Sequence, residues 1–329
     1  MELACAFATS MDTPEHIRVA EDLGYRRAWC YDSPALYPDV WVTLARSADR
    51  TERIGLGPGV LVPSLRHPMV NAAAIATLEA LAPGRVAVAV GAGFTGRHVL
   101  GQRAMRWTDV AAYVQVLQAL LRGEEVTWEG ATLRMLHPAG HGAPRPVVVP
   151  LLIGVGGPKG VAVAAELGAG VLCAGTVTRG SEAFDEVSVL TFGTVLEPGE
   201  DPASERVRAA AGHGVAVAYH AVYERRGEAV DSFPGGEAWR RAVESVPVER
   251  RHLAIHEGHL IAPNERDLLA LDADPSLAAS LTVTGTPDDV RSRIDALASR
   301  GATEVAYQPA GPDIPRELEA FAAAVRSGS

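Results

Sequence analysis

The sequence predicts an α/β protein, a (β/α)8 TIM barrel with two insertions in a single domain that spans residues 1–329. Three observations predict this fold. Short apolar runs alternate with helix-length amphipathic segments, which is typical of βαβ units and a parallel sheet. The runs are apolar throughout, as strands buried on both faces require. Eight such runs can be assigned along the chain, and this barrel has eight strands.

The first half of the chain supplies four of these strands, each bounded by turn residues. Thr13-Pro14 places a cap and a first-turn proline at a helix start, and Gly24 ends that helix. Gly84-Arg85 turns the chain into the fourth strand. We expect strands at 3–9, 28–31, 54–62 and 85–90, and helices at 13–23, 38–49 and 68–81.

The second half is less regular. We expect an insertion at about 97–145 that holds a helix over 108–121, and a helical insertion at about 203–275 that covers the active face. The remaining strands are expected at 151–155, 170–173, 187–195 and 304–308. One helix is expected to end at residue 167, and another to begin at the cap Thr286.

Composition excludes several classes of function. The net charge of −10 argues against nucleic acid and anionic lipid as partners. The chain has neither a basic leader nor an apolar run of about 18 residues, so we expect a cytoplasmic protein with no membrane partner. Cys5, Cys30 and Cys173 are scattered, which predicts buried small side chains, no disulfide framework and no metal site.

The expected strand ends indicate where chemistry could occur, because barrel active sites lie at the carboxyl ends of the strands. These ends carry glycines and hydroxyls but few acids or bases, which leaves room for a flat cofactor. "GVGGPKG" (154–160) opens a helix and could bind an anion, although a simple tight turn is the alternative. "GTVTR" (175–179) adds hydroxyls and a guanidinium suited to phosphate.

The third strand contains an interruption. "GPGVLVPSLRHP" (57–68) places a proline and two glycines inside an apolar run. Proline cannot donate to the sheet, and glycine in a strand indicates a bulge or the close approach of a ligand or another backbone.

Several motifs carry a family resemblance. They are "LGYRRAWCYDSP", "TERIGLGPGVLVPSLRHP", "TLEALAPGRVAVAVGAGF", "IGVGGPKGVAVAAELGAGVLCAG" and "VTGTPDDV". In this order they resemble the luciferase-like superfamily. They are most similar to its coenzyme F420-dependent branch, which includes methylenetetrahydromethanopterin reductase and F420-dependent glucose-6-phosphate dehydrogenase. The resemblance covers most of the chain but is weak over 97–145 and 203–275.

The resemblance implies a cofactor site for F420. A non-proline cis peptide would lie at Gly59–Val60, behind the deazaflavin ring. The other residues that it places at the ring are Asp32, Gly91, Gly93 and Phe94. Those that it places at the phosphate and side chain are Gly154, Val155, Gly156, Gly157, Gly175, Thr176, Thr178 and Arg179. The sugar-phosphate dehydrogenases carry a histidine where this chain has Ser33, and a glutamate where "GAGFTG" has no carboxylate, so sugar oxidation is not expected.

"HEGH" offers His256, Glu257 and His259 as catalytic acids or bases, although structural histidines are the alternative. It lacks the spacing of the HExxH zinc motif. Residues expected to line the substrate pocket are Ser33, Tyr37, His220 and Tyr223.

We therefore expect an F420-dependent oxidoreductase that reduces an activated C=C or C=N bond or oxidises an alcohol of a small molecule. The alternatives are an FMN-dependent monooxygenase of the luciferase or alkanesulfonate type, and a cofactor-binding protein without catalysis. The helices at 38–49 and 68–81 are apolar and Ala-rich, and the resemblance implies a homodimer that forms through this region. The substrate and the direction of hydride transfer stay open.

Overall fold

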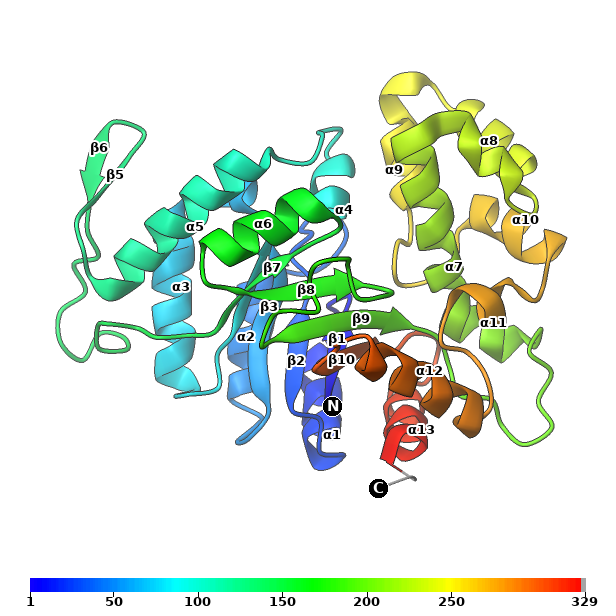
Figure 1. The fold of residues 1–329 in the computed structure, drawn as a ribbon, viewed down its shortest axis with the longest axis horizontal. Coiled ribbons are helices and arrows are strands. Elements are labelled where there is room, and N and C mark those ends of the chain that lie inside the picture. The colour runs from blue at the N-terminus through cyan, green and yellow to red at the C-terminus, as the bar shows by residue number, and fades with distance from the viewer. Residues whose placement is uncertain (327–329) are drawn as a thin grey trace.

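The computed structural model describes residues 1–326, and within them eight parallel strands close into a barrel (Figure 1). Around the barrel the strands follow the order β1-β10-β9-β8-β7-β4-β3-β2. They are β1 (Glu2–Phe7), β2 (Arg27–Cys30), β3 (Gly55–Leu61), β4 (Val88–Gly91), β7 (Leu151–Gly154), β8 (Gly170–Ala174), β9 (Val187–Phe192) and β10 (Glu304–Gln308). The predicted fold class is confirmed.

Helices surround this barrel, and their ends follow from local capping. The carboxylate of Asp39 accepts hydrogen bonds from the amides of Trp41 and Val42, so α2 begins two residues later than expected. Thr286 caps α12 as predicted and forms a capping box with Asp289. The surrounding helices are α1 (Thr13–Asp22), α2 (Val40–Ala48), α3 (Pro68–Leu81), α5 (Trp107–Arg122), α6 (Pro158–Glu166), α12 (Pro287–Ser299) and α13 (Ile314–Arg326).

A group of helices lies between β9 and β10, where the helical insertion was expected. Figure 1 shows these helices grouped beside the barrel, in yellow-green to orange. They have a core of their own, in which Tyr219 and Trp239 are fully buried. The elements are α7 (Glu205–Arg226), η2 (Gly227–Ser232), α8 (Gly236–Glu244), η3 (Val248–Arg250), α9 (Arg251–His256), α10 (Glu265–Ala273) and α11 (Leu277–Leu281).

The segment between β4 and β7 differs from the expectation in one respect. It holds the short helix α4 (Phe94–His98) and then α5, but also an antiparallel hairpin of β5 (Val126–Trp128) and β6 (Ala131–Leu133) that was not predicted. The hairpin projects from the body of the molecule beyond α5 (Figure 1). Its strands are three residues long, which is too short for an alternating pattern to stand out in the sequence.

The strands are buried as their apolar composition predicted. All residues of β2, β4 and β10 are buried. The barrel interior is lined mainly by small side chains and by Trp29, whose Nε1 donates to Glu304 Oε1 at 3.0 Å. Cys5, Cys30 and Cys173 are free and buried, as expected. Among the described residues, none of the helices combines the length and apolarity needed to cross a bilayer.

Candidate cofactor and active site

The interruption in β3 is a bulge that brings Val60 against two neighbouring strands. The register with β4 shifts between Gly59 and Leu61, and the Gly59–Val60 peptide is cis, as the resemblance implied. A β-carbon at Gly91 would lie 2.8 Å from Val60 Cγ2, and one at Gly154 would lie 2.7 Å from Val60 Cγ1. The glycines that end β4 and β7 therefore make room for the Val60 side chain.

Asp32 lies at the end of β2, where it was predicted, but its carboxylate is held by an arginine. Nη1 of Arg66 donates to both carboxylate oxygens at 2.7 Å, and the amide of Val62 adds a bond of 3.3 Å. Burial raises the pKa of Asp32, and Arg66 partly offsets this effect. Arg66 also bonds Asp39, so one guanidinium joins the end of β2 to the start of α2.

Sequence reasoning missed the role of Arg66. The only local signal was its place in "RHP", after the short 3-10 turn η1 (Pro63–Leu65) that follows β3. The carboxylate and the guanidinium are far apart in sequence, and they meet because β2 and β3 are neighbours in the barrel.

The loops after β7 and β8 contain the residues expected at a phosphate. Gly156 and Gly175 are exposed, and a β-carbon at Gly156, Gly157 or Gly175 would meet no atom within 4 Å. Gly156 and Gly157 precede α6, whose N-terminus offers backbone amides to an anion, and Gly175 follows β8. Thr178 Oγ1 donates to Val155 O at 3.5 Å and so joins the two loops, while Thr176 and Arg179 are exposed. These residues therefore fit an anionic group such as the phosphate of F420.

The helix α4 connects the end of β4 to the helices of the insertion. Gly93 caps it with a φ of 78°, in the left-handed region that favours glycine. The centroids of the Phe94 and His98 rings are 4.5 Å apart. The Arg225 guanidinium lies over the Phe94 ring, 5.1 Å from its centroid. Phe94, which was predicted to lie near the ring of the cofactor, is thus placed between the barrel and α7.

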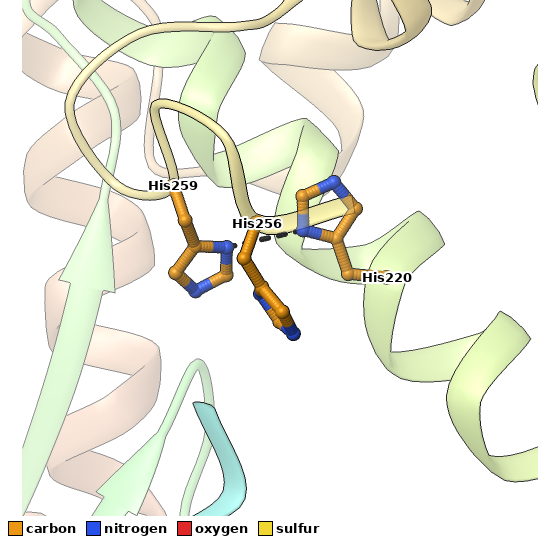
Figure 2. Close-up of side chains that lie close together, drawn as sticks. All are labelled: His220, His256 and His259. Carbon is orange, nitrogen blue, oxygen red and sulfur yellow. Dashed lines mark hydrogen bonds between the residues drawn. The ribbon is translucent and has the colours of Figure 1, made fainter. Parts of the chain in front are cut away.

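Three histidines gather where the insertion meets the barrel (Figure 2). They are His220 from α7, His256 from α9 and His259 from the following loop, and all three are buried. Nδ1 of His220 lies 3.0 Å from Nδ1 of His259. His256 and His259 were predicted as catalytic residues and His220 as a residue of the substrate pocket. The structure brings all three into one cluster.

Each of these histidines has a polar partner on its Nε2 atom. His220 contacts Asp267 Oδ1 at 2.9 Å, His256 contacts Glu224 Oε1 at 2.8 Å, and His259 contacts Thr95 Oγ1 at 3.2 Å. Sequence reasoning missed these three partners, because they come from three separate elements, α10, α7 and α4, and share no local motif. Burial, together with the neighbouring histidines, holds the pKa of His259 well below its usual range. Burial also lowers the pKa of His256, although Glu224 opposes the shift.

Glu224 is the acidic centre of a second, adjoining group. His98 Nδ1 lies 2.8 Å from Glu224 Oε2, an ion-pair distance, although the two atoms are not aligned for a hydrogen bond. Burial opposes ionisation of Glu224, but the contacts with His256 and His98 lower its pKa to about 2. The group is therefore built around a largely buried carboxylate, 10% exposed, that is ionised at neutral pH.

The other predicted residues have different positions. Tyr37 is buried and its hydroxyl donates to His259 O at 2.6 Å. Tyr223 packs edge-on against Trp239, inside the insertion. The Glu257 side chain is 73% exposed and lies 3.7 Å from Arg266, so it points to solvent rather than into the histidine cluster.

A second hydrogen bond joins the "HEGH" segment to the barrel. Gln308 Nε2, at the end of β10, donates to Leu260 O at 2.6 Å. Its own amide oxygen accepts from the Tyr31 hydroxyl at 2.7 Å. With Tyr37, this chain of bonds holds the segment that carries His256 and His259 over the carboxyl ends of the strands.

Comparisons with known proteins agree with this architecture. The family described as "Luciferase-like monooxygenase" matches residues 8–304. The chain is 27% identical to 5,10-methylenetetrahydromethanopterin reductase of Archaeoglobus fulgidus, over 92% of this chain and 91% of that protein. It is 37% identical to F420-dependent glucose-6-phosphate dehydrogenase of Beutenbergia cavernae, over 47% of this chain and 46% of that protein. The solved structure of coenzyme F420-dependent tetrahydromethanopterin reductase from Methanopyrus kandleri aligns with a TM-score of 0.67 at 20% identity, covering 99% of each chain.

Proposed function

The chain belongs to the luciferase-like monooxygenase family of oxidoreductases, and we propose that it is a coenzyme F420-dependent member that transfers a hydride between the deazaflavin and a small organic substrate. The observation that carries the proposal is the packing of Val60 against Gly91 and Gly154, which forms a floor of backbone and one β-branched side chain at the carboxyl ends of three strands. A flat ring needs such a floor. Relatives named as F420-dependent support the choice of cofactor.

We assign the cofactor to two groups of residues. Gly59, Val60, Gly91, Gly93, Phe94 and Asp32 would contact the ring. Gly154, Val155, Gly156, Gly157, Gly175, Thr176, Thr178 and Arg179 would hold the phosphate and side chain. Open space at Gly156, Gly157 and Gly175, beside the N-terminus of α6, supports this assignment. When bound, F420 would supply a carbon centre that gives or takes a hydride. The protein's part is to orient ring and substrate and to handle the proton.

Proton exchange with the substrate would run through His259 and Thr95. Nε2 of His259 contacts Thr95 Oγ1, and Thr95 directly follows Phe94 of the proposed ring site. Burial and the neighbouring histidines lower the pKa of His259, which favours the neutral imidazole, and its Nε2 could exchange a proton with the Thr95 hydroxyl. His256 would act through Glu224. Glu257, the remaining member of the predicted catalytic set, is solvent-exposed, and the proposal gives it no contact with substrate.

The substrate pocket stays a prediction built on Ser33, Tyr37, His220 and Tyr223. Ser33 is the best placed of these, since it follows Asp32 and its Oγ would lie 3.3 Å from a β-carbon at Gly96 of α4. The hydroxyl of Tyr37 and both nitrogens of His220 already have protein partners. The proposed substrates are small molecules whose C=C or C=N bond is reduced, or whose alcohol is oxidised to a C=O group.

Assembly and location complete the proposal. Val42 on α2 and Val70 on α3 are 61% and 52% exposed, and we propose that they lie in a homodimer interface. The three free thiols fit a reducing compartment, so the cytoplasm is the proposed location.

The test is a titration of purified apoprotein with F420 and, separately, with FMN, followed by cofactor fluorescence. Micromolar or tighter binding of F420, weakened about tenfold or more by Arg179→Ala, is expected. Preferential binding of FMN would overturn the assignment and indicate the monooxygenase alternative. Binding of F420 without turnover of any unsaturated, imine or alcohol substrate would indicate a binding protein.

A further inference from the structure

We propose that His220, His256 and His259 bind a divalent transition-metal ion that prefers imidazole ligands, such as Zn²⁺, at the junction of the helical insertion and the barrel. One ring nitrogen of each lies within 4.8 Å of one nitrogen of the other two, and all three side chains are buried. Tetrahedral Zn–N bonds of about 2.0–2.1 Å place two ligand nitrogens roughly 3.3 Å apart. The Nδ1 atoms of His220 and His259, at 3.0 Å, are already close to that separation.

The partners on Nε2 occupy one nitrogen of each ring, and the ion would replace the contact between the Nδ1 atoms of His220 and His259. Asp267, Glu224 and Thr95 each contact the Nε2 atom of one of the three rings. Histidines that bind metals commonly use one nitrogen for the metal and donate the other N–H to a carboxylate, a carbonyl or a similar acceptor, which sets the tautomer and the ring orientation. The cluster has this second layer on every ring. Figure 2 shows the three rings grouped together, from α7 and from the segment of α9 and its loop.

His256 supplies an independent sign of a missing ligand. Its side chain is fully buried, its Nε2 contacts Glu224, and its Nδ1 has no hydrogen-bond partner among the described residues. A buried polar atom without a partner is uncommon in folded proteins, because its desolvation is not offset. A metal ion at the centre of the cluster would give this nitrogen a partner.

The surrounding charge favours an ion as well. The hydrogen bond between the Nδ1 atoms of His220 and His259 holds one proton. Metal binding would move this proton to Nε2 of His259, and the N–H there would donate to Thr95 Oγ1. The buried carboxylate of Asp267 and the largely buried one of Glu224 would offset the charge of a dication.

The ion would join segments that are distant in sequence. It would connect α7 to the "HEGH" segment and, through Thr95, to α4 at the end of β4. No metal was predicted from the sequence, because "HEGH" lacks the HExxH spacing and no cysteine pair has ligand spacing. His220 lies far upstream of the other two histidines. This inference does not depend on which cofactor the protein uses.

The experiment uses tag-free, full-length protein stripped of metal with a chelator and then titrated with Co²⁺. We expect one Co²⁺ per chain at micromolar or tighter affinity, with the intense visible absorption of a four-coordinate site, and displacement by Zn²⁺. Failure to bind Co²⁺ stoichiometrically, or the weak absorption of a six-coordinate ion, would overturn the proposal. Neither readout needs F420 or a substrate.

Variants locate the ion. His220→Ala and His259→Ala should each weaken Co²⁺ binding by about tenfold or more, and so should Asp267→Asn, which keeps all three ligands but removes the partner of His220. His252→Ala is the matched control, because His252 lies one turn before His256 on α9, is half-buried and belongs to neither histidine group. Unchanged circular dichroism would show that each variant is folded. Loss of Co²⁺ in His98→Ala but not in His220→Ala would place the ion in the His98–Glu224–His256 group and overturn the assignment.

Discussion

Cγ1 of Val60 lies 2.7 Å from the position that a β-carbon would take at Gly154. Cγ2 of Val60 would likewise lie 2.8 Å from a β-carbon at Gly91. These two glycines were expected to give a cofactor close access to the backbone. In the structure they first give space to Val60, whose position follows from the bulge in β3. The floor of the proposed cofactor site therefore depends on the match between one β-branched side chain and two glycines.

Replacing Gly154 or Gly91 by alanine should destabilise the protein by about 1–3 kcal/mol, because the added methyl group overpacks against Val60. Urea unfolding measures the change. Gly156→Ala is the control, since its β-carbon would meet no atom within 4 Å. Adding Val60→Ala to Gly154→Ala should restore most of the loss, and a double mutant no more stable than the single one would contradict this account.

Arg66→Met should destabilise the protein by about 3–5 kcal/mol at pH 7, because it leaves the buried carboxylate of Asp32 without its charged partner. The folded-state pKa of Asp32 is already raised, and it should rise further in the variant. The variant should therefore regain stability as the pH falls through that pKa, where folding takes up a proton.

The double variant Asp32→Asn/Arg66→Met should recover much of this loss at pH 7, because no buried charge is then unpaired. Arg53→Met is the control, since the Arg53 side chain is 67% exposed and lies 3.9 Å from Glu21. Equal effects of the Arg53 and Arg66 variants on urea midpoints would contradict the prediction.

His213 should make stability depend on pH below neutrality. It is buried on α7, neither ring nitrogen has a hydrogen-bond partner among the described residues, and burial lowers its pKa to about 4. Between about pH 6.5 and pH 4 the unfolded chain binds a proton that the folded protein does not. The folded state should therefore lose up to about 3 kcal/mol across this window, and the loss should level off below it.

His213→Met should remove this part of the pH dependence, and His252→Met, at a half-buried site, should not. Urea unfolding at several pH values measures both variants. A slope in His213→Met that equals the wild-type slope would exclude His213 as its source. Some dependence should remain in every variant, because the pKa values of His256 and His259 are also lowered.

The three thiols should not react with a disulfide reagent in the native protein. Burial raises the pKa of Cys30 to about 12 and that of Cys5 well above its usual range, so little thiolate forms, and all three side chains are buried. Colorimetric titration should detect no thiol in the folded protein and three in guanidinium chloride. Rapid reaction of a native thiol would show that a buried segment opens easily.

The proposed dimer can be tested at α2 and α3. Val42→Glu and Val70→Glu should each convert the dimer to a monomer, because a charge would be buried in an apolar contact. Light scattering after size-exclusion chromatography measures the mass. Val148→Glu is the control, since Val148 is 81% exposed and lies outside both helices. A monomeric wild type would overturn the assembly proposal.

Much of the fold could be read from local patterns. The strands of the barrel, the cap at Thr286 and the interruption in the third strand follow from residues within a few positions of one another, whereas the family resemblance located the cis peptide at Gly59–Val60. Apolar runs, turn residues and capping side chains act over such short distances, so each element carries its own signal. The hairpin of β5 and β6 was not predicted, because its strands are too short to show an alternating pattern in the sequence.

The site was harder to predict from the sequence, because its side-chain contacts join residues that are distant in the chain. Arg66 meets Asp32 because the barrel places β2 beside β3, and His220 meets His259 because α7 folds back against the "HEGH" segment. Pairs of this kind leave no spacing to recognise in a single chain. Local chemistry thus dictates which elements form and where, whereas closure of the barrel and docking of the insertion determine which side chains meet in the site.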